Sequence, residues 1–147
     1  HQDPRYTLMW SALGYPACTV AIPLVMQADC LPDYMLARDT NAIVGHGLNS
    51  EICNLSMAIK DKWVFPMHIS NGQRYIALQH ILCDYPQRSS LLRNVHQVEQ
   101  QIANDFTSIY SAWQEGKISD DIFYHQYKKV SAGWFEKVKS ALSAYIE

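Results

Sequence analysis

The stretch 90–113, SLLRNVHQVEQQIANDFTSIYSAW, decides the expected fold of this chain. Apolar residues recur along it in steps of three and four, at Leu91, Val95, Val98, Ile102, Phe106, Ile109 and Trp113. This period places all of them on one stripe of an α-helix. Ser89 and Ser90 offer an N-terminal cap and Gly116 is a natural stop. The sequence therefore predicts one long amphipathic helix.

The last part of the chain repeats this pattern. Ser119, Asp120 and Asp121 offer a helix cap and acidic residues for the first turn. A second apolar stripe follows at Phe123, Tyr127, Val130, Trp134, Val138, Ala141 and Tyr145, and the lysines of this segment fall off the stripe. The sequence therefore predicts a second long helix over 123–145.

Further helices are expected upstream of these two. Periodicity and capping residues predict helices over about 6–14, 17–28, 40–62 and 73–83. No alternating run typical of a strand is convincing, and no internal repeat is visible. We therefore expect an all-α fold, a bundle of five or six helices that forms a single helical domain over 1–147.

Composition and charge exclude several classes of protein. The 147 residues suffice for one hydrophobic core, and 48% of them are hydrophobic against 18% charged, unlike a disordered chain. The formal net charge of -2 gives no basic field, so we expect no nucleic-acid partner. No run of about 18 apolar residues occurs, so no membrane span is expected. The chain starts at His1 without Met, so we expect a processed, tagged or truncated start.

The cysteines leave two alternatives open. Cys18, Cys30, Cys53 and Cys83 lie far apart and form no C-x-x-C pair, which disfavours a zinc site. Two disulfides in a secreted protein and four free, buried thiols in a cytosolic one are equally compatible with this spacing.

Two polar pairs have simpler explanations than catalysis. His96 and Glu99 can meet on one helix, but a surface pair explains them. Asp120 and Asp121 begin like an aspartate-rich motif that binds Mg²⁺, because hard cations prefer oxygen ligands. Tyr124 stands at the last acidic position of that motif, and a helix cap explains the two aspartates better.

The order of features from Arg5 to Asp61 carries a family resemblance. Arg5 opens an apolar segment, Leu31-Pro32-Asp33 forms a Leu-Pro-acidic step, and Lys60-Asp61 follows. In this order the chain resembles the C-terminal half of class I terpene synthases. Those all-α enzymes hold Mg²⁺ and a prenyl diphosphate at the mouth of an apolar, aromatic-lined pocket. The resemblance covers most of this chain but about half of a family domain, and it implies part of the isoprenoid synthase fold.

The resemblance also implies site residues. Arg5 and Lys60 would contact the diphosphate, and Asp61 would bind one Mg²⁺ ion. In this register Cys53 and Met57 occupy the metal-binding Asn and Ser positions of the family, where neither is a good Mg²⁺ ligand. The resemblance therefore leaves one carboxylate for the metal and assigns these two side chains to the pocket.

A rival register places the metal motif further along the chain. Asn104, Asp105 and Ser108 match its first positions, but Ala112 stands where the final acid belongs. In either register the resemblance implies a pocket whose aromatic faces stabilise a carbocation. The expected lining is Cys53, Met57, Tyr75, Phe106, Tyr110, Tyr127 and Trp134.

Two classes of function follow from these expectations. The first is a diverged terpene synthase-like domain that binds or cyclises a hydrophobic isoprenoid, with Mg²⁺ as its cofactor, alone or as a half-domain completed by a partner chain. The alternative is a non-enzymatic helical module. It either binds a ligand as a secreted, disulfide-stabilised domain, or packs against another chain or a second copy of itself.

Overall fold

The structure is a computed structural model that describes residues 3–26, 31–36, 50–64, 67–70, 73–76 and 88–146. Its α-helices are α1 (Glu51–Ile59), α3 (Arg88–Gln114) and α4 (Asp120–Leu142), and a π-helical turn, Lys60–Val64, extends α1. Its strands form two antiparallel hairpins, β1 (Leu8–Ser11) with β2 (Ile22–Val25) and β3 (Met67–Ser70) with β4 (Gln73–Ile76). Short 3-10 turns span Pro4–Tyr6, Pro16–Cys18, Asp33–Met35 and Ser143–Tyr145.

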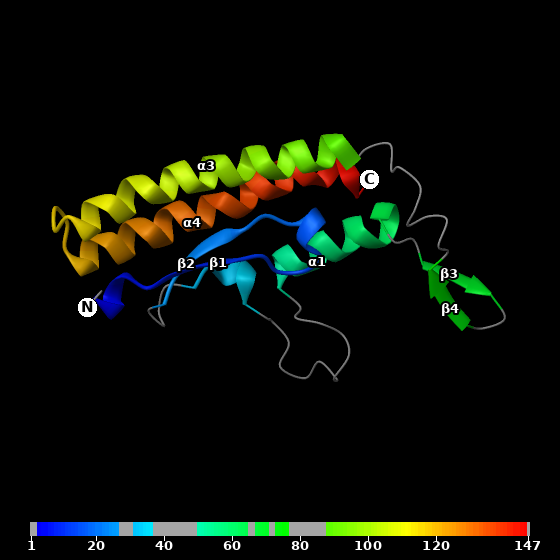
Figure 1. Cartoon of the computed structure of the whole chain (residues 1–147), viewed down its shortest axis with the longest axis horizontal. Coiled ribbons are helices and arrows are strands. Elements are labelled where there is room, and N and C mark those ends of the chain that lie inside the picture. The colour runs from blue at the N-terminus through cyan, green and yellow to red at the C-terminus, as the bar shows by residue number, and fades with distance from the viewer. Residues whose placement is uncertain are drawn as a thin grey trace.

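The helices α3 and α4 run antiparallel as a long helical hairpin (Figure 1). The apolar stripes predicted from the sequence meet between them and form the largest part of the core. The ring of Trp113 stacks on that of Phe123 with centroids 4.0 Å apart. Trp134 meets Phe106 and Tyr127 edge to face. Such pairs contribute about 0.5–1.5 kcal/mol each beyond the burial of their surface.

The turn between α3 and α4 follows from local sequence signals. Gly116 has a φ of 70°, and its N–H donates to the Trp113 carbonyl at 3.0 Å. The next N–H, of Lys117, reaches the Ala112 carbonyl at 2.9 Å, which completes a Schellman motif. Ser119 then caps α4 by accepting from the Ile122 N–H. The two long helices predicted from the sequence are therefore confirmed.

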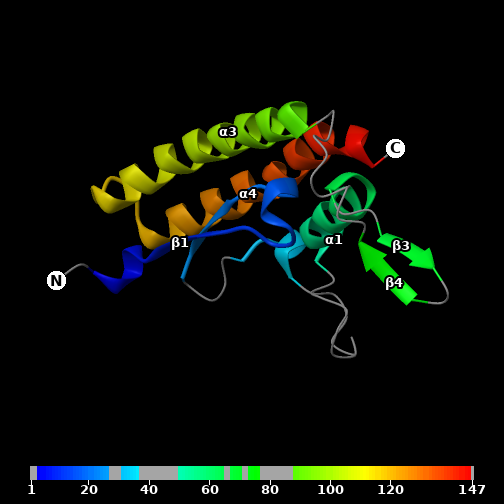
Figure 2. The same ribbon diagram turned by 45° about the vertical axis from the view of Figure 1, so that its right-hand side comes forward.

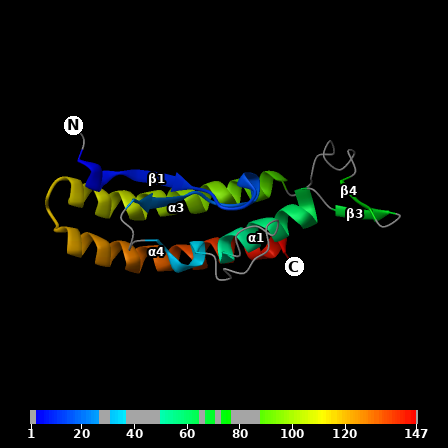
Figure 3. The same ribbon diagram turned by 90° about the horizontal axis from the view of Figure 1, so that it is seen from below.

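The β1–β2 hairpin lies along one face of this helical hairpin (Figure 3). All four residues of β2 are buried, whereas β1 is partly exposed. Leu8 pairs with Val25 and Ser11 with Ile22. The helix α1 and the segment 31–36 lie beside α4, and the β3–β4 hairpin projects beyond the end of α1 (Figure 2). The core therefore sits between the helical hairpin and the N-terminal half of the described chain.

The loop between β1 and β2 approaches α1 closely at Gly14. This residue has a φ of 97°, and a Cβ atom added to it would stand 2.6 Å from Ser56 Oγ. The Ser56 hydroxyl accepts from the Tyr15 N–H at 2.8 Å and donates to the Tyr15 carbonyl at 3.1 Å. The buried Ser56 side chain thus holds this loop against α1 through both the N–H and the carbonyl of Tyr15.

The predicted bundle of five or six helices is wrong. The described residues are mostly helical, but they form three α-helices and not five or six. The strands β1 and β2 lie where helices were predicted over 6–14 and 17–28. Because β2 is buried on both faces, its residues do not alternate between apolar and polar, and the strand lacks the period-two signal. Pro23 is tolerated there because it forms a non-hydrogen-bonded pair with Trp10, in which the residue on β2 donates no N–H to β1.

The predictions for the two remaining helices, 40–62 and 73–83, differ in outcome. The helix predicted over 40–62 is helical from Glu51, where Ser50 caps it by accepting from the Cys53 N–H. Residues 40–49 lie outside the described residues. The helix predicted over 73–83 is wrong for its first four residues, which form β4, and its remainder also lies outside the described residues.

Candidate ligand pocket

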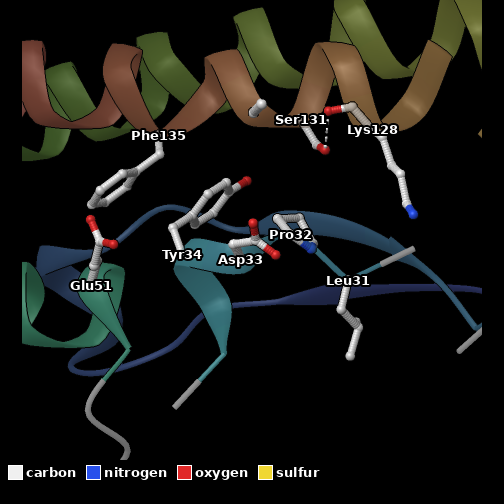
Figure 4. A pocket seen from close by; sticks show the side chains of 9 residues that line it. Leu31, Pro32, Asp33, Tyr34, Glu51, Lys128, Ser131 and Phe135 are labelled. Carbon is white, nitrogen blue, oxygen red and sulfur yellow. Dashed lines mark hydrogen bonds between the residues drawn. The ribbon is translucent and has the colours of Figure 1, made fainter. Parts of the chain in front are cut away.

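A pocket of about 370 Å³ lies between the segment 31–35 and α4 (Figure 4). Its lining comes from three elements that are distant in sequence: the 3-10 turn with the residues before it, the first turn of α1, and the middle of α4. The lining residues are Leu31, Pro32, Asp33, Tyr34, Glu51, Lys128, Ser131, Ala132 and Phe135. Its volume falls within the range of small-molecule sites, roughly 300–1,000 Å³.

The wall on one side is a short turn built by its own sequence. Pro32 precedes the turn with φ -64° and ψ 137°, an extended conformation that its ring favours. Its carbonyl accepts from the Met35 N–H at 2.9 Å, which closes the turn. This geometry buries Tyr34 and Met35 and leaves Asp33 exposed at the pocket. The turn therefore presents one aromatic ring and one carboxylate side by side.

The opposite wall is one face of α4. Lys128, Ser131, Ala132 and Phe135 are spaced by three, one and three residues, so their side chains point the same way. Phe135 stacks on Tyr34 with ring centroids 5.0 Å apart and planes within 9° of parallel. The Ser131 hydroxyl donates to the Lys128 carbonyl at 3.2 Å. The floor of the pocket is thus aromatic, and the charged side chains of Asp33 and Lys128 are exposed at its rim.

The charges of the pocket are unequal. Glu51 lies at the end near Phe135, Lys128 lies at the other end, and Asp33 lies between them (Figure 4). Among the lining residues that the structure describes, two carboxylates therefore face one ammonium group. Burial raises the pKa of Tyr34 far above its usual range, so its hydroxyl stays neutral. This arrangement fits a ligand with an apolar body and a cationic or hydroxyl head group.

The residues that the resemblance assigns to the diphosphate lie at different places. The Arg5 guanidinium contacts Asp3 at 2.7 Å and Asp120, the first residue of α4, at 3.3 Å. The Lys60 ammonium contacts Asp61 at 2.6 Å, and its neighbour Lys62 donates to the carbonyl of Ile146, beyond the other end of α4. The length of α4 alone, about 35 Å for its 23 residues, separates these ends. The structure does not bring Arg5 and Lys60 together, and neither lines the pocket.

The residues of the rival metal register lie on α3. Asp105 accepts from the Lys137 ammonium at 2.6 Å and from the Trp134 indole N–H at 3.3 Å. Asn104 and Ser108 are exposed on the same helix. Asp105 therefore joins α3 to α4 as a structural bridge. In the described ranges, no group of three His, Cys, Asp or Glu side chains lies close enough to hold a metal ion.

The side chains predicted to line an aromatic pocket lie mostly in the core. Phe106, Tyr127 and Trp134 are buried against one another, and Tyr110 is half-buried beside Phe106. Cys53 is buried on α1, and Met57 is exposed on the same helix. Tyr75 lies on β4. None of these predicted residues is among the described lining of the pocket.

Two of the cysteines are free thiols. Cys18 and Cys53 are both buried and unpaired, and burial raises the pKa of each thiol. A framework of two disulfides would need both of them. Cys30 and Cys83 lie outside the described residues. Across the described parts of the chain, no helix combines the length and the apolar character needed to cross a membrane.

Sequence reasoning found one part of the pocket and missed the rest. The Leu31-Pro32-Asp33 step was singled out by the family resemblance, and all three residues line the pocket. Phe135 and Glu51 were missed, because Phe135 stands off the main apolar stripe of α4 and Glu51 looks like an ordinary first-turn acid. Two adjacent aromatic residues on a helix, Trp134 and Phe135, were the available signal for a second contact face.

No protein-family model, no curated protein and no solved structure significantly matches this chain. Its function is therefore argued from the chemistry of its own surfaces.

Proposed function

We propose that this chain binds a small amphipathic molecule in the pocket between segment 31–35 and α4. The observation that carries the proposal is the stacked Tyr34–Phe135 floor with the carboxylates of Asp33 and Glu51 at its rim. The apolar body of the ligand lies against the floor and against Leu31. Its head group, an amine or a hydroxyl, lies at the carboxylates.

The charge of the rim selects the head group. An ammonium group next to an exposed carboxylate gains roughly 1 kcal/mol in a water-like medium, and more where water is excluded. A diphosphate would meet Lys128 as the only cation among the described lining residues and would be repelled by Asp33 and Glu51. The rim therefore favours cationic ligands over neutral ones, and neutral ones over anions.

The apolar lining suits an isoprenoid as the body of the ligand, which is the ligand class implied by the resemblance to terpene synthases. Prenyl chains are flexible and apolar, and they suit a wall made of two aromatic rings, a leucine and a proline. The proposal keeps the isoprenoid and changes its head group from a Mg²⁺-bound diphosphate to an amine or alcohol.

The test is a series of ligands that share one body and differ in charge. Geranylamine, geraniol and geranyl diphosphate, the last with and without Mg²⁺, are titrated into the protein by calorimetry. We expect affinity to fall in that order. Asp33→Asn should weaken the amine several-fold and leave geraniol unchanged, because it removes one negative charge and keeps the shape of the side chain.

A matched pair of substitutions locates the binding. Ala132 is exposed and lines the pocket, so Ala132→Leu fills it without disturbing the core. Lys129 is exposed on the same helix but does not line the pocket, and Lys129→Leu adds the same side chain elsewhere. We expect Ala132→Leu to abolish binding and Lys129→Leu to preserve it. Equal effects of the two, or tightest binding of the diphosphate with Mg²⁺, would reject the proposal.

A further inference from the structure

The register of the β1–β2 hairpin fixes which backbone groups face outward. In an antiparallel pair, alternate residues bond to the neighbouring strand, and the residues between them turn their N–H and C=O groups away from it. The Met26 N–H donates to the Thr7 carbonyl at 3.1 Å, which sets the phase of this alternation. Met9 accordingly bonds to β2, whereas Leu8 and Trp10 turn both polar groups to the outer edge of β1.

The outer edge of β2 is closed by side chains from the helical hairpin. The Ala21 N–H, just before β2, donates to Glu99 on α3 at 2.9 Å. The Tyr127 hydroxyl of α4 donates to the Pro23 carbonyl at 2.8 Å. Pro23 has no N–H to offer at this edge. A further strand therefore gains little by pairing with β2.

The outer edge of β1 differs from that of β2 within the described residues. Among the strands that the structure describes, none lies along it. The Tyr6 carbonyl, before the strand begins, accepts from the Tyr110 hydroxyl at 2.7 Å, and this bond lies at one end of the edge. A groove of about 600 Å³ lies at this same end of the edge, between the segment from Asp3 to Leu8 and the side chains of Tyr110 and Gln114 on α3. The edge thus combines outward-facing polar backbone groups with a concave surface beside them.

The side chains along β1 lack the features that usually prevent strand pairing. Exposed edges are commonly protected by charged residues, above all lysine, or by proline. The strand β1 has neither, and no charged residue occurs from Tyr6 to Ala21. Met9 and Trp10 are each 45% exposed. Trp10 also contacts Phe106 on α3, so its ring already stands over the helical side of the sheet.

We propose that β1 pairs with β1 of a second copy of this chain, antiparallel and about a two-fold axis at Met9. In this register, Leu8 of each copy faces Trp10 of the other, and the outward N–H and C=O groups of these residues satisfy one another. Thr7 of each copy faces Ser11 of the other at the ends of the paired strands, so no like charges meet within them. The two hairpins then form one continuous sheet.

The register explains the exposed side chains of the strand. On the helical side, Trp10 of each copy covers Leu8 of the other along the groove beside Tyr110. On the opposite side, the two Met9 side chains meet at the axis. Cross-strand pairs of this kind, with an aromatic against an aliphatic residue, are the units that stabilise a sheet.

The first test is the mass of the particle in solution. Sedimentation equilibrium of the full chain from micromolar to millimolar concentration should show a monomer–dimer equilibrium. Met9→Lys places two ammonium groups opposite each other at the axis and should give a monomer. Met26→Lys is the matched control, because Met26 is a methionine that is 58% exposed and lies beyond the end of β2. It should dimerise like the unmodified chain.

Two further measurements test the register itself. Mixing the Met9→Lys and Met9→Glu variants should restore a dimer that neither forms alone, because opposite charges then meet at the axis. Amide hydrogen exchange should slow with concentration at Leu8 and Trp10, while the Met9 amide stays protected throughout. A monomer at every concentration, a dimeric Met9→Lys variant, or exchange at Leu8 and Trp10 that ignores concentration would overturn the proposal.

Discussion

Substitution of Gly14 by alanine tests the close approach of the β1–β2 loop to α1. The backbone at Gly14 has a φ of 97°, which costs an L-residue about 1–2 kcal/mol. The added Cβ would also stand 2.6 Å from Ser56 Oγ and 2.7 Å from Ser56 Cβ. Because Ser56 Cβ is fixed to the backbone of α1, the loop has to move away.

That movement breaks the two hydrogen bonds between Ser56 and Tyr15. Each contributes about 0.5–1.5 kcal/mol to the free energy of unfolding. Alanine recovers about 0.4–1 kcal/mol by restricting the unfolded chain. The expected net loss in the free energy of unfolding for Gly14→Ala, measured by urea denaturation, is therefore about 1–5 kcal/mol.

Two other glycines serve as matched controls. At Gly116, with φ 70°, an added Cβ meets nothing within 4 Å, so Gly116→Ala should cost only the backbone strain, about 1 kcal/mol. Gly133 lies inside α4 with open space around it, so Gly133→Ala should stabilise by about 0.5–1 kcal/mol. In a Ser56→Gly background, the cost of Gly14→Ala should fall to that of Gly116→Ala. A Gly14→Ala variant no less stable than Gly116→Ala would refute the reasoning.

Two further predictions concern the N-terminal segment. Tyr127→Phe removes the hydroxyl that donates to the buried Pro23 carbonyl, and should lower the free energy of unfolding by about 1–3 kcal/mol in urea denaturation; an unchanged value would mean that the carbonyl finds another donor. Burial raises the pKa of the Cys18 thiol to about 11, so the stability it contributes is present below pH 9 and is lost as pH rises from 9 through 11, by at most about 3 kcal/mol. The melting temperature should therefore fall less between pH 9 and pH 11 for Cys18→Ala than for the unmodified chain. An identical dependence of the melting temperature on pH would contradict the assignment.

The helical hairpin was predictable because its signals are local. Each long helix carries an uninterrupted apolar stripe, and Gly116 and Ser119 mark the turn between the helices. The predicted bounds of the first, 90–113, differ from those of α3 by two residues at one end and one at the other. Capping and periodicity act within a few residues, so one sequence suffices to find them.

The strands were missed because their signals depend on the rest of the fold. The strand β2 is apolar throughout, since α3 and α4 cover it, and a short apolar run is compatible with helix or strand. The pocket was missed for a similar reason, because its walls come from segments that are distant in sequence. Tyr34 meets Phe135 only after the segment 31–36 has crossed to α4, and no spacing within the chain predicts that crossing.

The bonds that hold the N-terminal segment imply an order of assembly. Tyr6 bonds to Tyr110 and Pro23 to Tyr127 across 104 residues of sequence, and Ala21 bonds to Glu99 across 78. Closing a loop of such length costs about 4 kcal/mol in chain entropy before any contact is gained. The α3–α4 hairpin closes through a short turn and meets no such cost, so it forms early and the N-terminal hairpin docks onto it late. During synthesis, β1 and β2 leave the ribosome before α3 and α4, so the N-terminal hairpin is expected to dock only after these two helices have emerged.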